Sequence, residues 1–284
     1  MAKKVVITSC DIVAGLRRLG LRRGDRVMTH SGLSSFGFVE GGAYAVIDAL
    51  RQAIGPEGTL MFPTFNHGKV EVFDRETTPS YNGTITETFR HLPEVRRSNH
   101  PTHAYAALGP DADRYVKDAY LHVTWGPESP LGRLIADGGW ILLLGVTQGT
   151  STAQHHGETY NRVKCFGLDM AAAYLTDEEG EVTASVGPSW RSGSCPYDSA
   201  AHETRLRYFG AVRDTYIGEA HIQLMRGSET VKAVGQLVRG ETGVDHCATC
   251  DQRPWLTLYE DDRRKNISGR QPSKWQRSAH QKKC

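Results

Sequence analysis

Apolar residues recur at helical spacing in several stretches of the chain. Between positions 12 and 19 they fall on one helical face, which predicts a helix over residues 8–20. Thr8 can cap its first turn with Asp11 at the capping-box position, and Gly20 can end it. Further helices are predicted over residues 41–54, 85–92, 129–136 and 152–162, and in a last helix capped by Ser228.

Short apolar runs bounded by turn residues predict strands between these helices. Strands are expected over residues 26–30, 58–63, 102–108, 140–145 and 221–225. Residues 170–176 and 181–186 flank a turn of the sequence Asp-Glu-Glu-Gly, which indicates a hairpin. Strands that alternate with helices are typical of an α/β layered architecture, and the added hairpin favours a mixed sheet.

The composition excludes disordered and fibrous classes, since 39% of the 284 residues are hydrophobic and 23% are charged. No apolar run approaches the ~20 residues needed to cross a bilayer. The first eight residues carry two lysines but no cleavage-like site, so no signal peptide is expected and the cytoplasm is the expected location.

The net charge of +2 conceals an asymmetry between the body and the C-terminal end. Residues 263–284 hold eight Lys/Arg and no acidic residue, which leaves 26 basic and 32 acidic residues, a net −6, in residues 1–262. A basic tail can touch nucleic acid or anionic membrane. Its low apolar content favours a solvated, disordered end instead, so one domain over 1–262 and no nucleic-acid or membrane partner are expected.

Two segments carry candidate chemistry. The loop at 31–37 contains Ser31, Ser34 and Ser35, and its backbone N–H groups can bind a phosphate or an acyl carbonyl, although an ordinary strand–helix turn has the same composition. His155 and Glu158 follow the strongest predicted strand and share a helical face. A carboxylate beside an imidazole suits a general base, although surface His–Glu pairs are also common.

Several ordered motifs resemble the aminoglycoside 3-N-acetyltransferase family. They are Val-Met-Thr-His-Ser-Gly-Leu-Ser-Ser-Phe-Gly at 27–37, Gly-Gly at 41–42, Gly-Pro-Glu-Gly-Thr-Leu-Met-Phe-Pro-Thr at 55–64, Arg-Ser-Asn-His-Pro at 97–101, Ser-Pro-Leu-Gly at 129–132, Leu-Leu-Leu-Gly-Val at 142–146, and Thr152 with His155 and Glu158. Residues 205–240 match more loosely, and those beyond about 255 have no counterpart.

The resemblance implies an α/β sandwich unlike the common acetyltransferase fold, and transfer of acetyl from acetyl-coenzyme A to the 3-amino group of an aminoglycoside, which gives antibiotic resistance. His155 would be the base and Glu158 its partner. The implied coenzyme A residues are Ser31, Ser34, Ser35, Phe36, Ser98, His100 and Thr152. The alternatives are acetylation of another amino sugar or biosynthetic amine, and a non-catalytic descendant that binds coenzyme A.

Family members usually carry a second carboxylate after the hairpin, and this chain departs from that pattern. By spacing back from Gly218 the expected positions hold Arg191 and Gly193, so Asp198 is the candidate. A polycationic substrate also favours acidic contacts. The candidates are Glu40, which follows the serine-rich loop, and Asp74, which lies in a loop that the family has near its acceptor. The alternative is that both are ordinary surface carboxylates.

Cys247 and Cys250 form a Cys-x-x-Cys pair, which is common in structural zinc sites. Cys195 could be a third ligand, and apramycin-type members of the family look similar here. His246 is adjacent to Cys247 and can point away, and His202 is the nearest later histidine to Cys195. The alternative is two exposed thiols near a flexible end. Spacing does not settle the oligomeric state, so a monomer or a homodimer is expected.

Overall fold

Alternate side chains of the central strands face two different hydrophobic layers in the computed structural model of the protein. The structure describes residues 5–161, 167–177, 179–191 and 199–239. In β8 (Trp140–Leu144), Trp140, Leu142 and Leu144 belong to one buried cluster, whereas Ile141 and Leu143 belong to the other. Both faces of the sheet are therefore covered, as the continuous apolar run predicted.

The central sheet is mixed, which confirms the predicted fold class. Its seven strands lie in the order β11-β12-β8-β2-β4-β7-β6, with β2 parallel to both β8 and β4 and the other pairs antiparallel. Their bounds are β2 (Arg26–Ser31), β4 (Thr59–Pro63), β6 (Arg96–Arg97), β7 (Tyr105–Leu108), β11 (Arg213–Ile217) and β12 (Ala220–Arg226).

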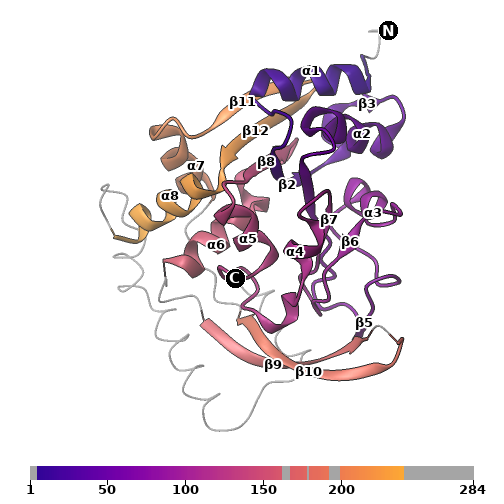
Figure 1. Cartoon of the computed structure of the whole chain (residues 1–284). Coiled ribbons are helices and arrows are strands. Elements are labelled where there is room, and N and C mark those ends of the chain that lie inside the picture. The colour runs from indigo at the N-terminus through magenta and orange to yellow at the C-terminus, as the bar shows by residue number, and fades with distance from the viewer. Residues whose placement is uncertain (1–4, 162–166, 178, 192–198, 240–284) are drawn as a thin grey trace.

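Helices cover the two faces of this sheet (Figure 1). On one face lie α1 (Ser9–Leu19), α2 (Gly42–Ile54) and α3 (Thr84–Arg90). On the other lie α4 (Ala112–Val116), α5 (Pro130–Ala136), α6 (Thr152–Tyr160), α7 (Ser199–Tyr208) and α8 (Gly227–Arg239). Among the described residues, no helix has the length and hydrophobicity needed to cross a membrane.

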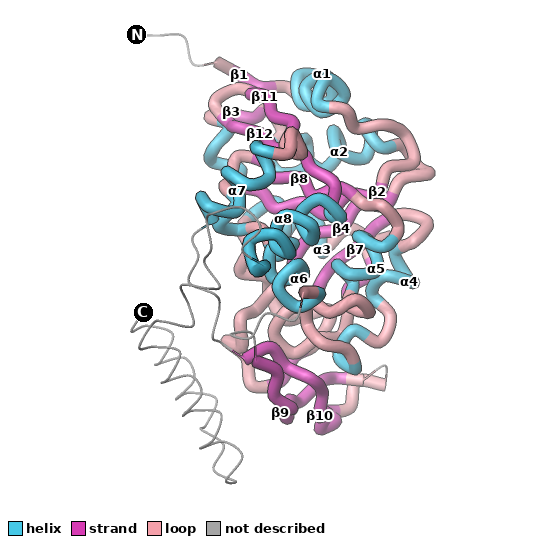
Figure 2. The backbone as a smooth tube through the Cα atoms, turned by 90° about the vertical axis from the view of Figure 1, so that its left-hand side faces the viewer, coloured by secondary structure: helices cyan, strands magenta, loops and turns pink. Residues whose placement is uncertain are grey.

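A second, smaller sheet lies apart from the central one, at the lower end of the molecule in Figures 1 and 2. The hairpin β9 (Gly167–Thr176) and β10 (Val182–Arg191) was predicted, and β5 (Val72–Phe73) joins it parallel to β9. Short pieces complete the fold: β1 (Val6–Ile7), β3 (Phe38–Val39), and the 3₁₀ turns η1 (Leu33–Phe36), η2 (Ala119–Leu121) and η3 (Gln148–Thr150).

Most predicted elements are present, and the last helix differs at its start. Ser228 does not cap the last helix, because the helix begins one residue earlier, at Gly227, directly after β12. A Cβ on Gly227 would lie 2.5 Å from Ile135, so the close junction needs glycine. The predicted domain over 1–262 and the basic tail over 263–284 extend outside the described residues.

We expect the Thr8→Ala substitution to lower the free energy of unfolding by about 1 kcal/mol. The Thr8 hydroxyl accepts a hydrogen bond from the backbone N–H of Asp11, and the Asp11 carboxylate accepts one from the backbone N–H of Thr8. Alanine loses the first of these bonds. Urea unfolding measures the change, and Thr8→Ser is the matched control because it keeps the hydroxyl. An equal loss in both variants would contradict the cap.

Candidate functional site

A cleft of ≈ 450 Å³ opens beside the C-terminal end of β2. The end of β2 and η1 line one side of it, and the first residues of α2 and α3 line the other. Gly41 and Gly42 have positive φ angles of 79° and 58°, and no side chain caps α2. The first N–H groups of α2 are therefore free of intrahelical partners and can bind an anion or a carbonyl.

Two of the predicted coenzyme A residues line this cleft directly. Ser31 and Ser34 both belong to the lining, and Ser34 is exposed. The Ser31 hydroxyl is buried and has no hydrogen-bond partner in the part of the chain that the structure describes. A buried hydroxyl without a partner is costly, so this oxygen is suited to accept or donate a bond to a ligand.

Ser35 and Phe36 fix the loop instead of facing the cleft. The Ser35 hydroxyl donates to the carbonyl of Gly145 at 2.5 Å, which ties η1 to the end of β8. Gly145 has a φ of +67°, and a Cβ there would lie 2.5 Å from the Ser35 Cβ. The Phe36 ring is 1% exposed and belongs to the core. The cofactor roles of Ser35 and Phe36 stay predictions.

Ser98 and His100 make protein contacts at the other predicted cofactor segment. The Ser98 hydroxyl accepts from the Tyr105 N–H at 2.8 Å. Nδ1 of His100 accepts from the N–H groups of Thr102 and His103 at 3.2 and 3.0 Å, so its Nε2 donates to Thr124 at 3.2 Å. Burial lowers the pKa of His100 to about 4. These bonds hold the turn before β7, and contact with a cofactor stays a prediction.

The predicted base and its carboxylate partner lie together on α6. Nδ1 of His155 lies 2.7 Å from Oε2 of Glu158, and the two side chains are 27% and 1% exposed. The buried carboxylate therefore accepts Nδ1–H and leaves Nε2 as the second, unprotonated nitrogen of a neutral ring. Oε1 of Glu158 is buried without a partner among the described residues.

Trp125 and His156 fix the orientation of His155. The indole of Trp125 stacks on the His155 ring, with centroids 4.6 Å apart and an interplanar angle of 24°. The next residue, His156, is 3% exposed and donates Nδ1–H to the Trp125 carbonyl at 2.6 Å. One turn of α6 thus contacts both the ring and the backbone of Trp125. Trp125 was not among the site residues predicted from the sequence.

Thr152, at the start of α6, contacts the protein through His30. Its hydroxyl lies 3.2 Å from Nε2 of His30, and its side chain is 7% exposed. Its predicted role toward coenzyme A is therefore not visible in these contacts and stays a prediction. His30 was also missed, because its only signal was a histidine two residues after Met28 in a predicted strand, and nothing in the sequence showed that it reaches α6.

The two predicted substrate carboxylates differ in their surroundings. Glu40 is exposed and follows Val39 at the rim of the cleft. Asp74 accepts hydrogen bonds from the N–H groups of Glu76 and Thr77 at 2.9 and 2.6 Å. Burial raises the pKa of Asp74, but the hydrogen bonds from Thr77 and Glu76 outweigh it and leave the pKa below its usual value. Asp74 thus organises its own loop as an anion.

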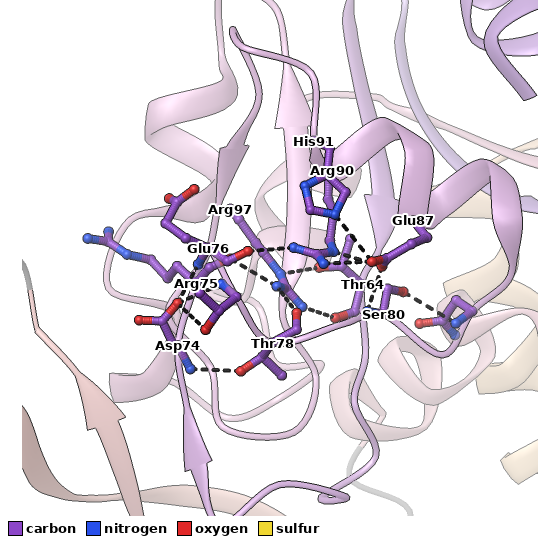
Figure 3. A network of polar contacts seen from close by, with 12 residues as sticks. Thr64, Asp74, Arg75, Glu76, Thr78, Ser80, Glu87, Arg90, His91 and Arg97 are labelled. Atoms are coloured by element: carbon purple, nitrogen blue, oxygen red, sulfur yellow. Dashed lines mark hydrogen bonds and ion pairs between the residues drawn. The ribbon is translucent and has the colours of Figure 1, made fainter. Parts of the chain in front are cut away.

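Buried Arg97 holds the Asp74 loop in place (Figure 3). Its guanidinium donates to the carbonyls of Arg75 and Thr78 on the loop, and to the carbonyl and hydroxyl of Thr64 after β4. Burial lowers the pKa of Arg97 to about 10, which still leaves it charged near pH 7. The loop that carries Asp74 is therefore tied to the central sheet.

The predicted metal ligands Cys195, Cys247 and Cys250, with neighbouring His246, lie outside the described residues, as does Asp198. Within the described ranges, no three His, Cys, Asp or Glu side chains are grouped to hold a metal ion. His202, in α7, is described and is fully buried. Burial and the charge of nearby His155 lower the pKa of His202 to about 4. His202 is therefore neutral near pH 7.

We expect the protein to lose stability as the pH falls from about 6.5 toward 4. Burial lowers the pKa of His30 to about 3 and that of His100 to about 4, from 6.5. Below pH 6.5 these histidines bind protons in the unfolded chain but not in the folded chain. The free energy of unfolding is therefore at its full value above pH 6.5 and decreases as the pH falls.

Each such histidine contributes at most about 1.4 kcal/mol per pH unit. Urea unfolding at about pH 7 and about pH 5 measures the loss. His100→Gln should show a shallower decrease, because one buried histidine is gone. A free energy of unfolding that stays constant over this interval would be evidence against neutral buried histidines.

The family model for aminoglycoside 3-N-acetyltransferase matches residues 28–239. The prophage-derived aminoglycoside N(3')-acetyltransferase-like protein YokD of Bacillus subtilis (strain 168) is 36% identical over 178 residues, covering 53% of this chain and 64% of its own length. This match covers less than two thirds of YokD. Aminoglycoside N(3)-acetyltransferase IV of Salmonella sp is 32% identical over 232 residues, covering 81% of this chain and 87% of its own length.

Solved structures agree with the fold. AAC-IIIb in a binary complex with CoASH has a TM-score of 0.75 at 25% identity, covering 84% of this chain and 98% of that one. Aminoglycoside acetyltransferase AAC(3)-IVa, as a histidine-to-alanine mutant with gentamicin, has a TM-score of 0.75 at 28% identity, covering 89% and 99%. With the mixed sheet and the ordered motifs, these matches show that the chain belongs to the aminoglycoside 3-N-acetyltransferase family.

Proposed function

We propose that the protein transfers an acetyl group from acetyl-coenzyme A to the 3-amino group of an aminoglycoside. The observation that carries the proposal is the His155–Glu158 pair at 2.7 Å, with its carboxylate buried and its imidazole partly exposed. Such a pair can take a proton from a substrate amine. The CoASH complex of AAC-IIIb and the gentamicin complex of AAC(3)-IVa support the two substrate classes.

The cleft and the pair both lie on segments that follow the C-terminal ends of two neighbouring strands, β2 and β8. Ser31, which lines the cleft, follows His30, which contacts the first residue of α6. β2 and β8 are parallel neighbours, so the segments after both strands emerge together. Ligand chemistry in α/β sheets is commonly placed outside the carboxyl ends of the strands. The proposed cofactor site and His155 therefore belong to one continuous site.

The residues of this chain can perform each step of direct amine attack. An amine attacks a thioester only as the free base, so the ammonium proton of the substrate is first lost to solvent. As the amine attacks, Nε2 of His155 takes a second proton from its nitrogen while Glu158 holds Nδ1–H. The C–N bond forms and the C–S bond then breaks, and the proton passes from His155 to the departing thiolate. Backbone N–H groups of the 31–36 loop are suited to stabilise the tetrahedral oxyanion. No cysteine is acylated.

Acidic side chains favour a cationic acceptor. Glu40 is exposed and follows Val39 of the cleft lining, and the hydrogen bonds to Asp74 keep the Asp74 carboxylate ionised. We infer that both contribute to binding the polycation, with Asp198 as the second carboxylate of the catalytic site. The location is proposed to be the cytoplasm, where acetyl-coenzyme A is made, and the unit a monomer or a homodimer.

Release of free thiol from acetyl-coenzyme A tests the proposal. The assay uses a panel of aminoglycosides and simple amino sugars. Turnover with aminoglycosides supports the proposal, and turnover only with other amines would support the alternative acceptor. Binding of coenzyme A without turnover on any amine would show a non-catalytic relative.

We expect His155→Ala to lower kcat by roughly 10²–10⁴-fold, because a general base is lost. The affinity for acetyl-coenzyme A should be kept, since the cleft is built from other residues. His91→Ala is a matched control: His91 also pairs with a glutamate, Glu87, at 3.3 Å, but is exposed at the end of α3. Steady-state rates that are equal in His155→Ala and wild type would remove His155 from the mechanism.

We further propose a structural zinc ion bound by Cys247, Cys250, Cys195 and one further protein ligand. Thiolates suit zinc, and an ion closed by four protein ligands has no open position for substrate. We expect about one zinc per chain by elemental analysis, and a chelator should lower the melting temperature because the metal binds only the folded state. A Cys247→Ser, Cys250→Ser double variant should lose the metal. Full occupancy in that variant would place the ion elsewhere.

A further inference from the structure

We propose that His30 is a positioning residue for His155: its imidazole caps the N-terminus of α6 from the neighbouring strand and fixes the helix that carries the base. This inference rests on the proposed role of His155. It assigns His30 no contact with substrate.

The cap is defined by two contacts to Thr152, the first residue of α6. The backbone N–H of Thr152 donates to Nε2 of His30 at 3.2 Å, and the Thr152 hydroxyl lies 3.2 Å from the same nitrogen. The first N–H groups of a helix have no intrahelical partner and need an acceptor. At α6 the preceding residue, Ser151, makes no side-chain cap, and its buried hydroxyl has no partner among the described residues. His30 supplies the acceptor that Ser151 does not.

The pleat of β2 directs His30 to the α6 side of the sheet. Successive residues of a strand face opposite sides. Val27 packs in the cluster with α1 to α3, and Met28 packs in the cluster with α4 to α8. His30 lies two residues after Met28 and therefore faces the same layer as α6. It is 6% exposed and is opposite Leu143 of β8.

The hydrogen bonds define which nitrogen of His30 carries the proton. An N–H donor needs a lone pair, so Nε2 is unprotonated and the neutral ring carries its proton on Nδ1. Burial, and to a smaller extent the charge of His155, lower the pKa of His30 to about 3. His30 thus stays neutral near pH 7, even when His155 becomes a cation during the reaction. A protonated His30 would have no acceptor for Thr152.

The cap acts on the base because the two lie on one face of the helix. Thr152 and His155 are three residues apart and are therefore neighbours on the helix surface, and His155 and Glu158 are neighbours in the same way. At its other side this turn is held by the His156 bond to the Trp125 carbonyl. Packing against α8 and the bond from Asn161 to the Val231 carbonyl hold the later part of α6. Loss of the His30 acceptor therefore loosens the first turn, and we expect the ring of His155 to shift relative to the cleft.

Two variants of His30 distinguish the effect of losing the hydrogen-bond acceptor from the effect of losing side-chain volume. Leucine fills the site without an acceptor, and glutamine can place its amide oxygen near the position of Nε2. We expect His30→Leu to lower kcat on the order of 10²-fold, as a misplacement of about 1 Å can do. The KM for acetyl-coenzyme A should not change, and His30→Gln should recover most of the rate. Thr29→Val is the matched control, since Thr29 is buried in the same strand but faces the opposite layer.

Wild-type kcat in folded His30→Leu would overturn the proposal. So would a His30→Gln enzyme that is as slow as His30→Leu while both keep the wild-type melting temperature, because the defect would then not follow the acceptor.

A second measurement does not depend on turnover. In ¹⁵N-labelled wild-type protein, the ring nitrogens of His30, assigned by their absence from the His30→Gln spectrum, report the tautomer directly. We expect Nε2 without a proton from about pH 7 down to about pH 5. A proton on Nε2 would overturn the cap even if the variants were slow or failed to fold. If no amine were acetylated, the proposed function would fail, and this spectrum would still decide the cap.

Discussion

The parallel pairing of β2 with β8 is the interaction on which the candidate site depends. It places Ser31 opposite Leu144 at the ends of the two strands, and the N–H of Gly32 continues the pairing to the Leu144 carbonyl at 2.9 Å. The loop after β2 forms one wall of the cleft, and the segment after β8 leads into α6. A single backbone register thus brings together the loop that lines the cleft and the helix that carries the His155–Glu158 pair, which are about 120 residues apart in the chain.

Neutral histidines surround the partly exposed His155. Burial lowers the pKa values of His30, His103 and His202, and the charge of His155 lowers each further. A protonated ring at any of these places would repel a cation on His155 and a cationic substrate. Burial at the sheet therefore keeps the histidines near the candidate base uncharged.

Much of the fold could be predicted because local signals agreed with the tertiary structure. The capping box marks the residue at which α1 begins. The apolar run of β8 marks a strand that is buried on both faces. α7 was missed because Leu206 is its only large aliphatic residue, so no apolar face is visible. The pairing of His155 with Glu158 followed from helical spacing. The contacts of His30 and Trp125 with α6 could not be predicted in this way, because they join residues that are distant in the sequence. The proposed cysteine ligands stay predictions.

The small sheet has a consequence for how this protein can diversify. β5 joins the β9–β10 hairpin through Phe73 opposite Leu175, and Asp74 follows directly. The hairpin exposes Tyr174 and Val182 and shares no strand with the central sheet. A mutation in the hairpin can act on the Asp74 loop through Phe73, while the hydrogen bonds of Arg97 hold the same loop to Thr64 after β4. Exposed hairpin residues such as Tyr174 can therefore vary at little cost to the stability of the central sheet.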